Sequence, residues 1–236
     1  MRNVFFACSM MAVLAAAPGI SIAADAPAAS ATATVPGPGP QELMKKVSQD
    51  LLRDLDANRA EYTQDPRKLR ALVDRHLLPH FDVQYAARLV LGQHWRTASE
   101  AQRKRFIDAF YQSLMRNYGD AIVEFTADRL SILPFKGDPA ATTATVRTQV
   151  KRSNGTPVPV NYSLRATPQG WKAWDVTIEG ISYVKNYRTD FGSEIAQKGI
   201  DAVILRLEAQ NASGQPDPSA PAAKPAAAAA PAKQTG

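Results

Sequence analysis

Residues 129 to 179, RLSILPFKGDPAATTATVRTQVKRSNGTPVPVNYSLRATPQGWKAWDVTIE, carry the clearest strand pattern in the sequence. Apolar and polar residues alternate in it over four segments, each bounded by Gly, Pro or Asn. This alternation is typical of strands that have one face against a core and the other in water. Ser153-Asn154-Gly155 predicts a hairpin loop between the second and third segments. We therefore expect a twisted antiparallel sheet of about four strands.

One face of this predicted sheet is apolar. Its positions are Leu130 and Ile132; Ala144, Val146, Thr148 and Val150; Val158, Val160, Tyr162 and Leu164; and Lys172, Trp174, Val176 and Ile178. Lys172 is the only charged residue among them, at a strand end where its amine can reach water. Asp175, Thr177 and Glu179 alternate with the last set, so we expect them on the wet face, as solvated side chains rather than a catalytic pair of carboxylates.

Helical spacing precedes and follows the strands. The first helix is expected over residues 43–55, and a second opens at Asp65-Pro66, a capping residue followed by proline, and closes before Pro79. A third covers residues 82–92, and the pattern of Thr97 and Glu100 predicts a capping box that opens a fourth. The helical period returns at residues 183–191 and 200–207.

Amphipathic helices must bury their apolar stripes, and the large apolar surface available is the inner face of the sheet. The order of helices, antiparallel sheet and helices therefore predicts an α+β domain with its helices on one face. A curved sheet covered in this way can enclose an apolar pocket.

The chain ends have the composition of segments outside a fold. Residues 1–23 combine Arg2, an apolar run of about 14 residues and a small-residue end, which predicts a cleavable export signal too short to span a membrane. Cys8, the only cysteine, lies in that signal. Residues 24–40 and 212–236 are rich in Ala and Pro and are expected to be disordered. The sequence therefore predicts a domain at 41–211 with no permanent membrane anchor, located in the periplasm.

Loss of Arg2 with the signal lowers the formal net charge from +6 to +5. The densest basic cluster is Arg103-Lys104-Arg105. Nucleic-acid binding would need a basic stripe with interleaved aromatic residues, which is missing, so no nucleic-acid partner is expected. A solvated helix face is the favoured interpretation of this cluster, and docking to acidic partners or anionic lipid headgroups is the alternative.

The residues favour neither a metal site nor an enzyme. His76 and His80 share a helical spacing, with His94 as a third candidate ligand, but Pro79 interrupts the spacing and no carboxylate completes the set. His76 is better explained as a hydrogen-bonded core histidine. The sequence contains no Gly-x-Ser-x-Gly, phosphate-binding loop or dinucleotide motif. We expect no metal and no catalytic residue.

Three stretches resemble a known family. LLPHFDVQYAARLVLGQHW at residues 77–95, TASEAQRKRFIDAF with LMRNYGDAI at residues 97–122, and WKAWDVTIEGISYVKNYRTDFGSEIAQKGIDAVILRL at residues 171–207 are similar to the MlaC, or toluene-tolerance, family. The resemblance covers residues 41–211.

The resemblance implies a periplasmic phospholipid carrier that maintains outer-membrane lipid asymmetry. It would shuttle lipid between an outer-membrane Mla lipoprotein complex and the inner-membrane Mla complex of an ABC transporter system, with phospholipid as cargo and no cofactor. Carriage of another lipid such as a hopanoid, or a cavity-type hydrolase or isomerase, are the alternatives. The lipid-binding residues are expected among the apolar positions, namely Leu89, Leu91, Phe110, Tyr118, Leu130, Ile132, Val146, Val150, Val160, Tyr162, Leu164, Trp174, Val176, Ile178, Ile181, Tyr183 and Phe191.

Overall fold

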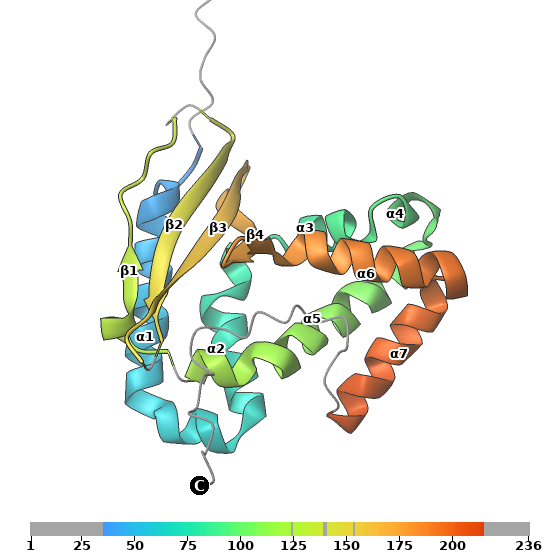
Figure 1. Ribbon diagram of the computed structural model, residues 1–236, viewed down its shortest axis with the longest axis horizontal. Helices are drawn as coiled ribbons and strands as arrows, with labels where there is room; N and C mark the ends of the chain where they lie inside the picture. The colour runs from blue at the N-terminus through green and yellow to red at the C-terminus, as the bar shows by residue number, and fades with distance from the viewer. Residues whose placement is uncertain (1–34, 124, 139–140, 153, 215–236) are drawn as a thin grey trace, which may run out of the picture. The chain divides into compact units, whose positions relative to one another are not determined.

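The α+β class and the antiparallel sheet are confirmed in a computed structural model, which describes residues 35–123, 125–138, 141–152 and 154–214 (Figure 1). The elements in order are α1 (Pro40–Gln64), α2 (Pro66–His76), η1 (Leu78–His80), α3 (Val83–Leu91), α4 (His94–Thr97), α5 (Glu100–Val123), η2 (Ala127–Arg129), β1 (Leu130–Ile132), β2 (Thr143–Lys151), β3 (Pro157–Thr167), β4 (Gly170–Ile178), β5 (Ile181–Ser182), α6 (Tyr183–Lys198) and α7 (Ile200–Ser213).

The sheet has five strands in the order β1-β2-β3-β4-β5, each antiparallel to its neighbour. The fifth strand, β5, is only two residues long and follows a turn after β4. Val146 pairs with Tyr162, and Tyr162 pairs with Val176, so these three side chains share one face. We call this face, which carries the expected apolar alternation of β1, β2 and β3, the inner face.

A bulge in β4 changes the facing of two residues. Ser163 pairs with Asp175, but Leu164 pairs with Ala173, so Trp174 has no partner of its own across the ladder. The expectation that Lys172 and Trp174 lie on the inner face is therefore wrong. Ala173 takes that place beside Leu164, and Trp171 shares the face with it.

The helix starts follow their capping residues. The Asp65 carboxylate accepts a hydrogen bond from the Arg67 amide and so caps α2, as expected. The predicted capping box at Thr97 and Glu100 is wrong by two residues. Ser99 and Gln102 form it instead: the Ser99 hydroxyl accepts from the Gln102 amide at 3.2 Å, and the Gln102 side chain accepts from the Ser99 amide at 2.9 Å. The short α4 ends at Thr97 just before it.

The helices form two groups around the sheet (Figure 1). The first half of α1 covers one end of the inner face, where Leu43, Met44 and Val47 pack against Val146 and Leu164. In the second group α3 packs on α6 and α5 on α7. These four helices bury a core of their own around Phe106, Phe110, Tyr187, Phe191 and Leu207.

Asp175 is buried, with 4% of its surface exposed, so the expectation of a solvated side chain on the wet face is wrong. The Asp175 carboxylate accepts a hydrogen bond from the Ser182 hydroxyl at 2.5 Å and one from the Val184 amide at 3.0 Å. Ser182 in turn caps α6 by accepting from the Lys185 amide. Asp175 therefore anchors the start of α6 to β4. Glu179 is exposed, as expected, and pairs with Arg152.

The expected export signal at residues 1–23 and nearly all of the expected tail at residues 212–236 lie outside the described residues. Val35, the first described residue, packs against the cluster of α1, β3 and β4. Among the described helices, none combines the length and the apolar composition needed to cross a bilayer.

Candidate functional site

The inner face brings together nine of the strand residues expected to bind lipid. These are Leu130, Ile132, Val146, Val150, Val160, Tyr162, Leu164, Val176 and Ile178. Thr148 lies among them and is buried, but its hydroxyl donates to the Val160 carbonyl at 2.7 Å, so its polar group is satisfied. At the described inner-face positions Tyr162 is therefore the only titratable side chain.

The two ends of the inner face are covered differently. At one end the buried stripe of α1 packs on Val146, Leu164, Trp171 and Ala173. The other end consists of Val150, Val158, Val160 and Ile178. The side chains that pack against this second end are only partly buried, and Phe125 and Tyr183 are those contributed from outside the strands. We call the part of the inner face around Val160, Tyr162, Val176 and Ile178 the open end.

Partly buried apolar residues also lie where the apolar clusters of the protein meet. Tyr162 contacts both clusters of the inner face, and Tyr183 contacts the open end and the helix core. Phe125 contacts the open end and a cluster of α1 and α2 that contains Leu55 and Leu72. The open end is thus bordered by aromatic side chains that keep accessible surface.

An aromatic series connects the helix core to the open end. Phe110 and Tyr187 lie 4.9 Å apart between ring centroids, and Tyr118 and Tyr183 lie 5.2 Å apart. The Tyr118 and Tyr187 hydroxyls are 3.4 Å apart. Tyr183 follows Ser182, so the anchoring of Ser182 by Asp175 fixes where this ring lies. Tyr118 and Tyr183 are therefore the expected site residues from the helices that reach the sheet.

The structure places the other expected residues elsewhere. Leu91, Phe110 and Phe191 are buried in the helix core, and Leu89 and Trp174 pack against it. Trp174 also makes an edge contact with Tyr85. Ile181 pairs with Ile178 across the β4–β5 ladder, but it is 41% exposed and is not one of the buried residues of the inner face.

Sequence reasoning missed Phe125, Trp171 and Ala173. Phe125 lies between a helix and a strand, where neither the helical nor the strand periodicity applies. The one indication in the sequence is that a large apolar residue lies in a connecting segment. Trp171 and Ala173 were assigned to the wrong face because the bulge was not foreseen.

Burial raises the pKa of the tyrosines at the open end above that of a free tyrosine, which is already neutral at physiological pH. It raises the pKa of Tyr162 to about 12, because a low-dielectric surrounding penalises the phenolate. Burial also raises the pKa of Tyr183, with a smaller contribution from Tyr118. The open end is therefore an apolar surface with neutral hydroxyls at physiological pH.

The histidines do not form a metal site within the described part of the chain. His76 Nε2 lies 2.8 Å from Asp54, which also accepts from Arg75 and Tyr62, so His76 is hydrogen-bonded between α1 and α2. The pKa of His80 is lowered by burial.

The fold defines a class: an α+β protein in which a five-strand antiparallel sheet has one apolar face that packs against helix α1. The MlaC protein family model matches residues 45–209, and the chain belongs to this family.

Relatives support the assignment. The chain is 26% identical over 180 residues to the intermembrane phospholipid transport system binding protein MlaC of Haemophilus influenzae, with 75% of this chain and 83% of that one aligned. It is 28% identical over 193 residues to the toluene tolerance protein ttg2D of Pseudomonas putida, covering 81% and 83%. A phospholipid-binding protein from Ralstonia solanacearum, solved in complex with a phospholipid, has a TM-score of 0.69, 26% identity, and covers 74% of this chain and 97% of its own.

Proposed function

We propose that this protein binds a phospholipid with its acyl chains against the open end of the inner face. The observation that carries the proposal is the state of Tyr162. Burial raises its pKa to about 12, yet its side chain keeps accessible surface. We infer an internal gap beside Tyr162, because its side chain is surrounded by protein and yet keeps accessible surface, and its partner across the ladder, Val176, is apolar. The phospholipid bound to the Ralstonia solanacearum protein supports this choice of ligand.

The chemistry of the open end suits acyl chains. Val160, Val176 and Ile178 offer apolar side chains, and the hydroxyl of Tyr183 stays neutral, so no charge must be desolvated when a chain enters. Burying one methylene contributes about 0.8 kcal/mol, so two chains with about 14 buried methylenes each gain on the order of 20 kcal/mol over water. Free lipid in water is therefore no useful intermediate, and the lipid stays inside the protein or a membrane.

We further propose that the protein is a carrier rather than an enzyme, and that it shuttles phospholipid across the periplasm between an outer-membrane and an inner-membrane Mla complex. A bilayer offers acyl chains nearly the same gain as the protein interior, so the two bound states differ by only a few kcal/mol. The partner that docks then decides the direction of transfer. The name of the Haemophilus influenzae relative, an intermembrane transport binding protein, supports this role.

Residues 1–23 are proposed to be the signal that exports the chain, with cleavage after Ala23, and residues 215–236 a tail that lipid binding does not need. Amino-terminal sequencing of the protein recovered from the periplasm tests the first point. Recovery of a chain that starts at Met1 contradicts it.

A transfer assay tests the carrier function. Protein loaded with fluorescent phospholipid is mixed with acceptor vesicles and with vesicles that carry each reconstituted membrane partner, in chelator and without ATP. Transfer to at least one acceptor is expected, because neither nucleotide nor metal acts on the carrier itself. A strict requirement of the isolated protein for metal, or release of a hydrolysed lipid, contradicts the proposal.

A further inference from the structure

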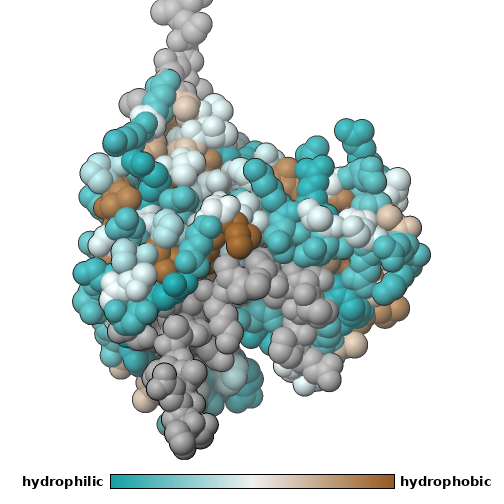
Figure 2. All heavy atoms as spheres, viewed as in Figure 1, coloured by the Kyte–Doolittle hydropathy of each residue, from teal (hydrophilic) through white to brown (hydrophobic). Residues whose placement is uncertain are grey.

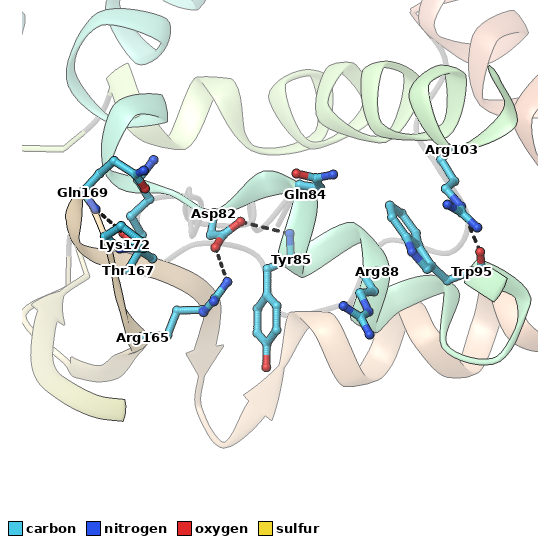
Figure 3. A pocket seen from close by; sticks show the side chains of 11 residues that line it. Asp82, Gln84, Tyr85, Arg88, Trp95, Arg103, Arg165, Thr167, Gln169 and Lys172 are labelled. Carbon is cyan, nitrogen blue, oxygen red and sulfur yellow. Dashed lines mark hydrogen bonds and ion pairs between the residues drawn. The ribbon is translucent and has the colours of Figure 1, made fainter. Parts of the chain in front are cut away.

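A recess runs along α3 (Figure 3). It has a volume of about 570 Å³ and is formed by α3, α4, the start of α5 and the β3–β4 hairpin. We call it the α3 groove. Its charged lining residues are Asp82, Arg88, Arg103, Arg165 and Lys172. Lipid binding at the open end does not explain these four cations and one carboxylate.

The single carboxylate of the α3 groove is already satisfied. Asp82 accepts from the Arg165 guanidinium at 2.6 Å and caps α3 by accepting from the Tyr85 amide at 3.0 Å. Arg88, Arg103 and Lys172 take part in none of the ion pairs within the described residues. The groove therefore presents an excess of three positive charges.

Two of the guanidinium groups are held in place by aromatic rings. Arg165 lies 4.4 Å from the centroid of the Tyr85 ring, and Arg103 lies 5.0 Å from that of Trp95. Arg103 also donates to the Trp95 carbonyl at 2.9 Å. Stacked guanidinium groups keep donors at their edges for carboxylates and lose little entropy on binding them.

The basic cluster Arg103-Lys104-Arg105 divides accordingly. Lys104 pairs with Asp108 at 2.6 Å, and Arg105 pairs with Glu208 on α7 at 2.7 Å. Only Arg103 turns its charge to the α3 groove. The two interpretations of this cluster therefore apply to different residues. Lys104 and Arg105 form a helix face neutralised by the protein's own carboxylates, whereas Arg103 is available to a partner.

The cations form a row rather than a cluster. Figure 3 shows Lys172 and Arg165 at one end of α3, Arg88 further along it, and Arg103 beyond Trp95. Within this row α3 alone, nine residues long, spans about 13 Å. A single phosphate meets only one or two of these groups at a time, whereas an extended peptide advances about 3.3 Å per residue, so about four residues are needed to follow α3.

We propose that the α3 groove docks an acidic segment of a partner protein, in extended conformation. The proposal deepens the carrier function, on which its biological meaning rests, because a carrier must dock where it receives or delivers lipid. A recess favours a peptide over a membrane surface, because a flat layer of lipid headgroups contacts cations that protrude from the surface. Arg165 is instead partly buried against Tyr85, and Arg103 against Trp95.

The test uses the full mature protein and fluorescent peptides of two, four and six glutamates, with binding followed by fluorescence anisotropy at low ionic strength. Affinity is expected to rise from two to four glutamates and not to fall at six, because about four extended residues are needed to follow α3 alone. The variant Arg88→Gln/Lys172→Gln should weaken tetraglutamate binding about tenfold, the sum of two partly screened ion pairs. The control Lys45→Gln/Lys185→Gln removes the same charge from exposed positions outside the groove and should change affinity less than about twofold.

Several results would overturn the proposal. Equal weakening by both double variants would mean that the peptide senses only net charge. If inorganic phosphate alone displaces tetraglutamate as well as free tetraglutamate does, the groove is a phosphate site. If the peptides never bind, and the wild type binds vesicles of phosphatidylglycerol and phosphatidylcholine but Arg88→Gln/Lys172→Gln does not, the target of the groove is a membrane. Bound phospholipid, measured in the same samples, should be unchanged. Its loss in Arg88→Gln/Lys172→Gln would assign the groove to lipid binding, and failure of docking with lipid retained leaves the lipid proposal intact.

Discussion

The buried carboxylate of Asp175 on β4 holds the hydroxyl of Ser182 at 2.5 Å, and this contact joins the sheet to the start of α6. The next residue, Tyr183, borders the open end of the inner face. The position of an aromatic wall of the proposed lipid site therefore depends on a polar contact on the opposite side of β4.

Replacing Asp175 with Ala should lower the free energy of unfolding by about 2–4 kcal/mol, because the partly buried Ser182 hydroxyl and the buried Val184 amide lose their acceptor. Asp175→Asn keeps one acceptor oxygen and should cost less. Urea unfolding followed by circular dichroism measures both. A loss below about 0.5 kcal/mol in Asp175→Ala would show that this contact does not anchor α6.

A charge placed on the open end should expel lipid. Val176→Glu puts a carboxylate beside Tyr162, where burying an unpaired charge costs several kcal/mol, and we expect phospholipid retention to fall at least about tenfold. Gln149→Glu adds the same charge on the exposed face of β2 and should retain its lipid. Phospholipid per protein is measured by phosphate assay after solvent extraction, with circular dichroism to confirm folding. Equal loss in both variants would contradict the assignment of the inner face.

The raised pKa of Tyr162 predicts a loss of stability at high pH. The unfolded chain releases this phenol's proton near pH 10, whereas the folded protein retains it until about pH 12. Stability from this group is thus fully present below pH 10 and falls by up to about 1.4 kcal/mol per pH unit between pH 10 and 12. Urea unfolding of the wild type and Tyr162→Phe at pH 9 and pH 11 should show a smaller fall in the variant. Equal falls would mean that the phenol is not buried.

The capping box of α5 gives a test of the corrected helix start. Ser99→Ala should cost about 1 kcal/mol, because the Gln102 amide loses its acceptor. Thr97→Ala, at the position expected from the sequence, should cost less, since the Thr97 hydroxyl only donates to the exposed His94 carbonyl. Thermal unfolding compares the two, and a larger cost at Thr97 would restore the original assignment.

Alternation predicted the inner face well in β1, β2 and β3 because a strand has a strict period of two and any regular ladder preserves it. It failed in β4, where one unpaired residue, Trp174, reverses the facing of every position before it. The bulge is a property of the pairing between Ser163 and Asp175, not of β4 alone. Local sequence therefore could not reveal it.

The candidate site was predicted in part for the same reason. The strand periodicity alone placed Tyr162 and Val176 on one face. The helical periodicity allowed Phe110 and Phe191 to face either the sheet or each other, and in the structure these rings of α5 and α6 pack on each other. Asp175 looked solvated because its acceptor role depends on Ser182, seven residues further along. The face of the molecule in Figure 2 is mostly hydrophilic, with small separate hydrophobic spots. Surface hydropathy on this face therefore does not indicate a lipid-binding site.

Whether the protein carries phospholipid is tested by purifying the mature protein from periplasmic extract and identifying its bound lipid by native and lipid mass spectrometry. About one phospholipid per protein is expected in the wild type, and little in Val176→Glu. A folded wild-type protein that carries no lipid and excludes apolar dyes, or one that carries a hopanoid in place of phospholipid, would contradict this expectation.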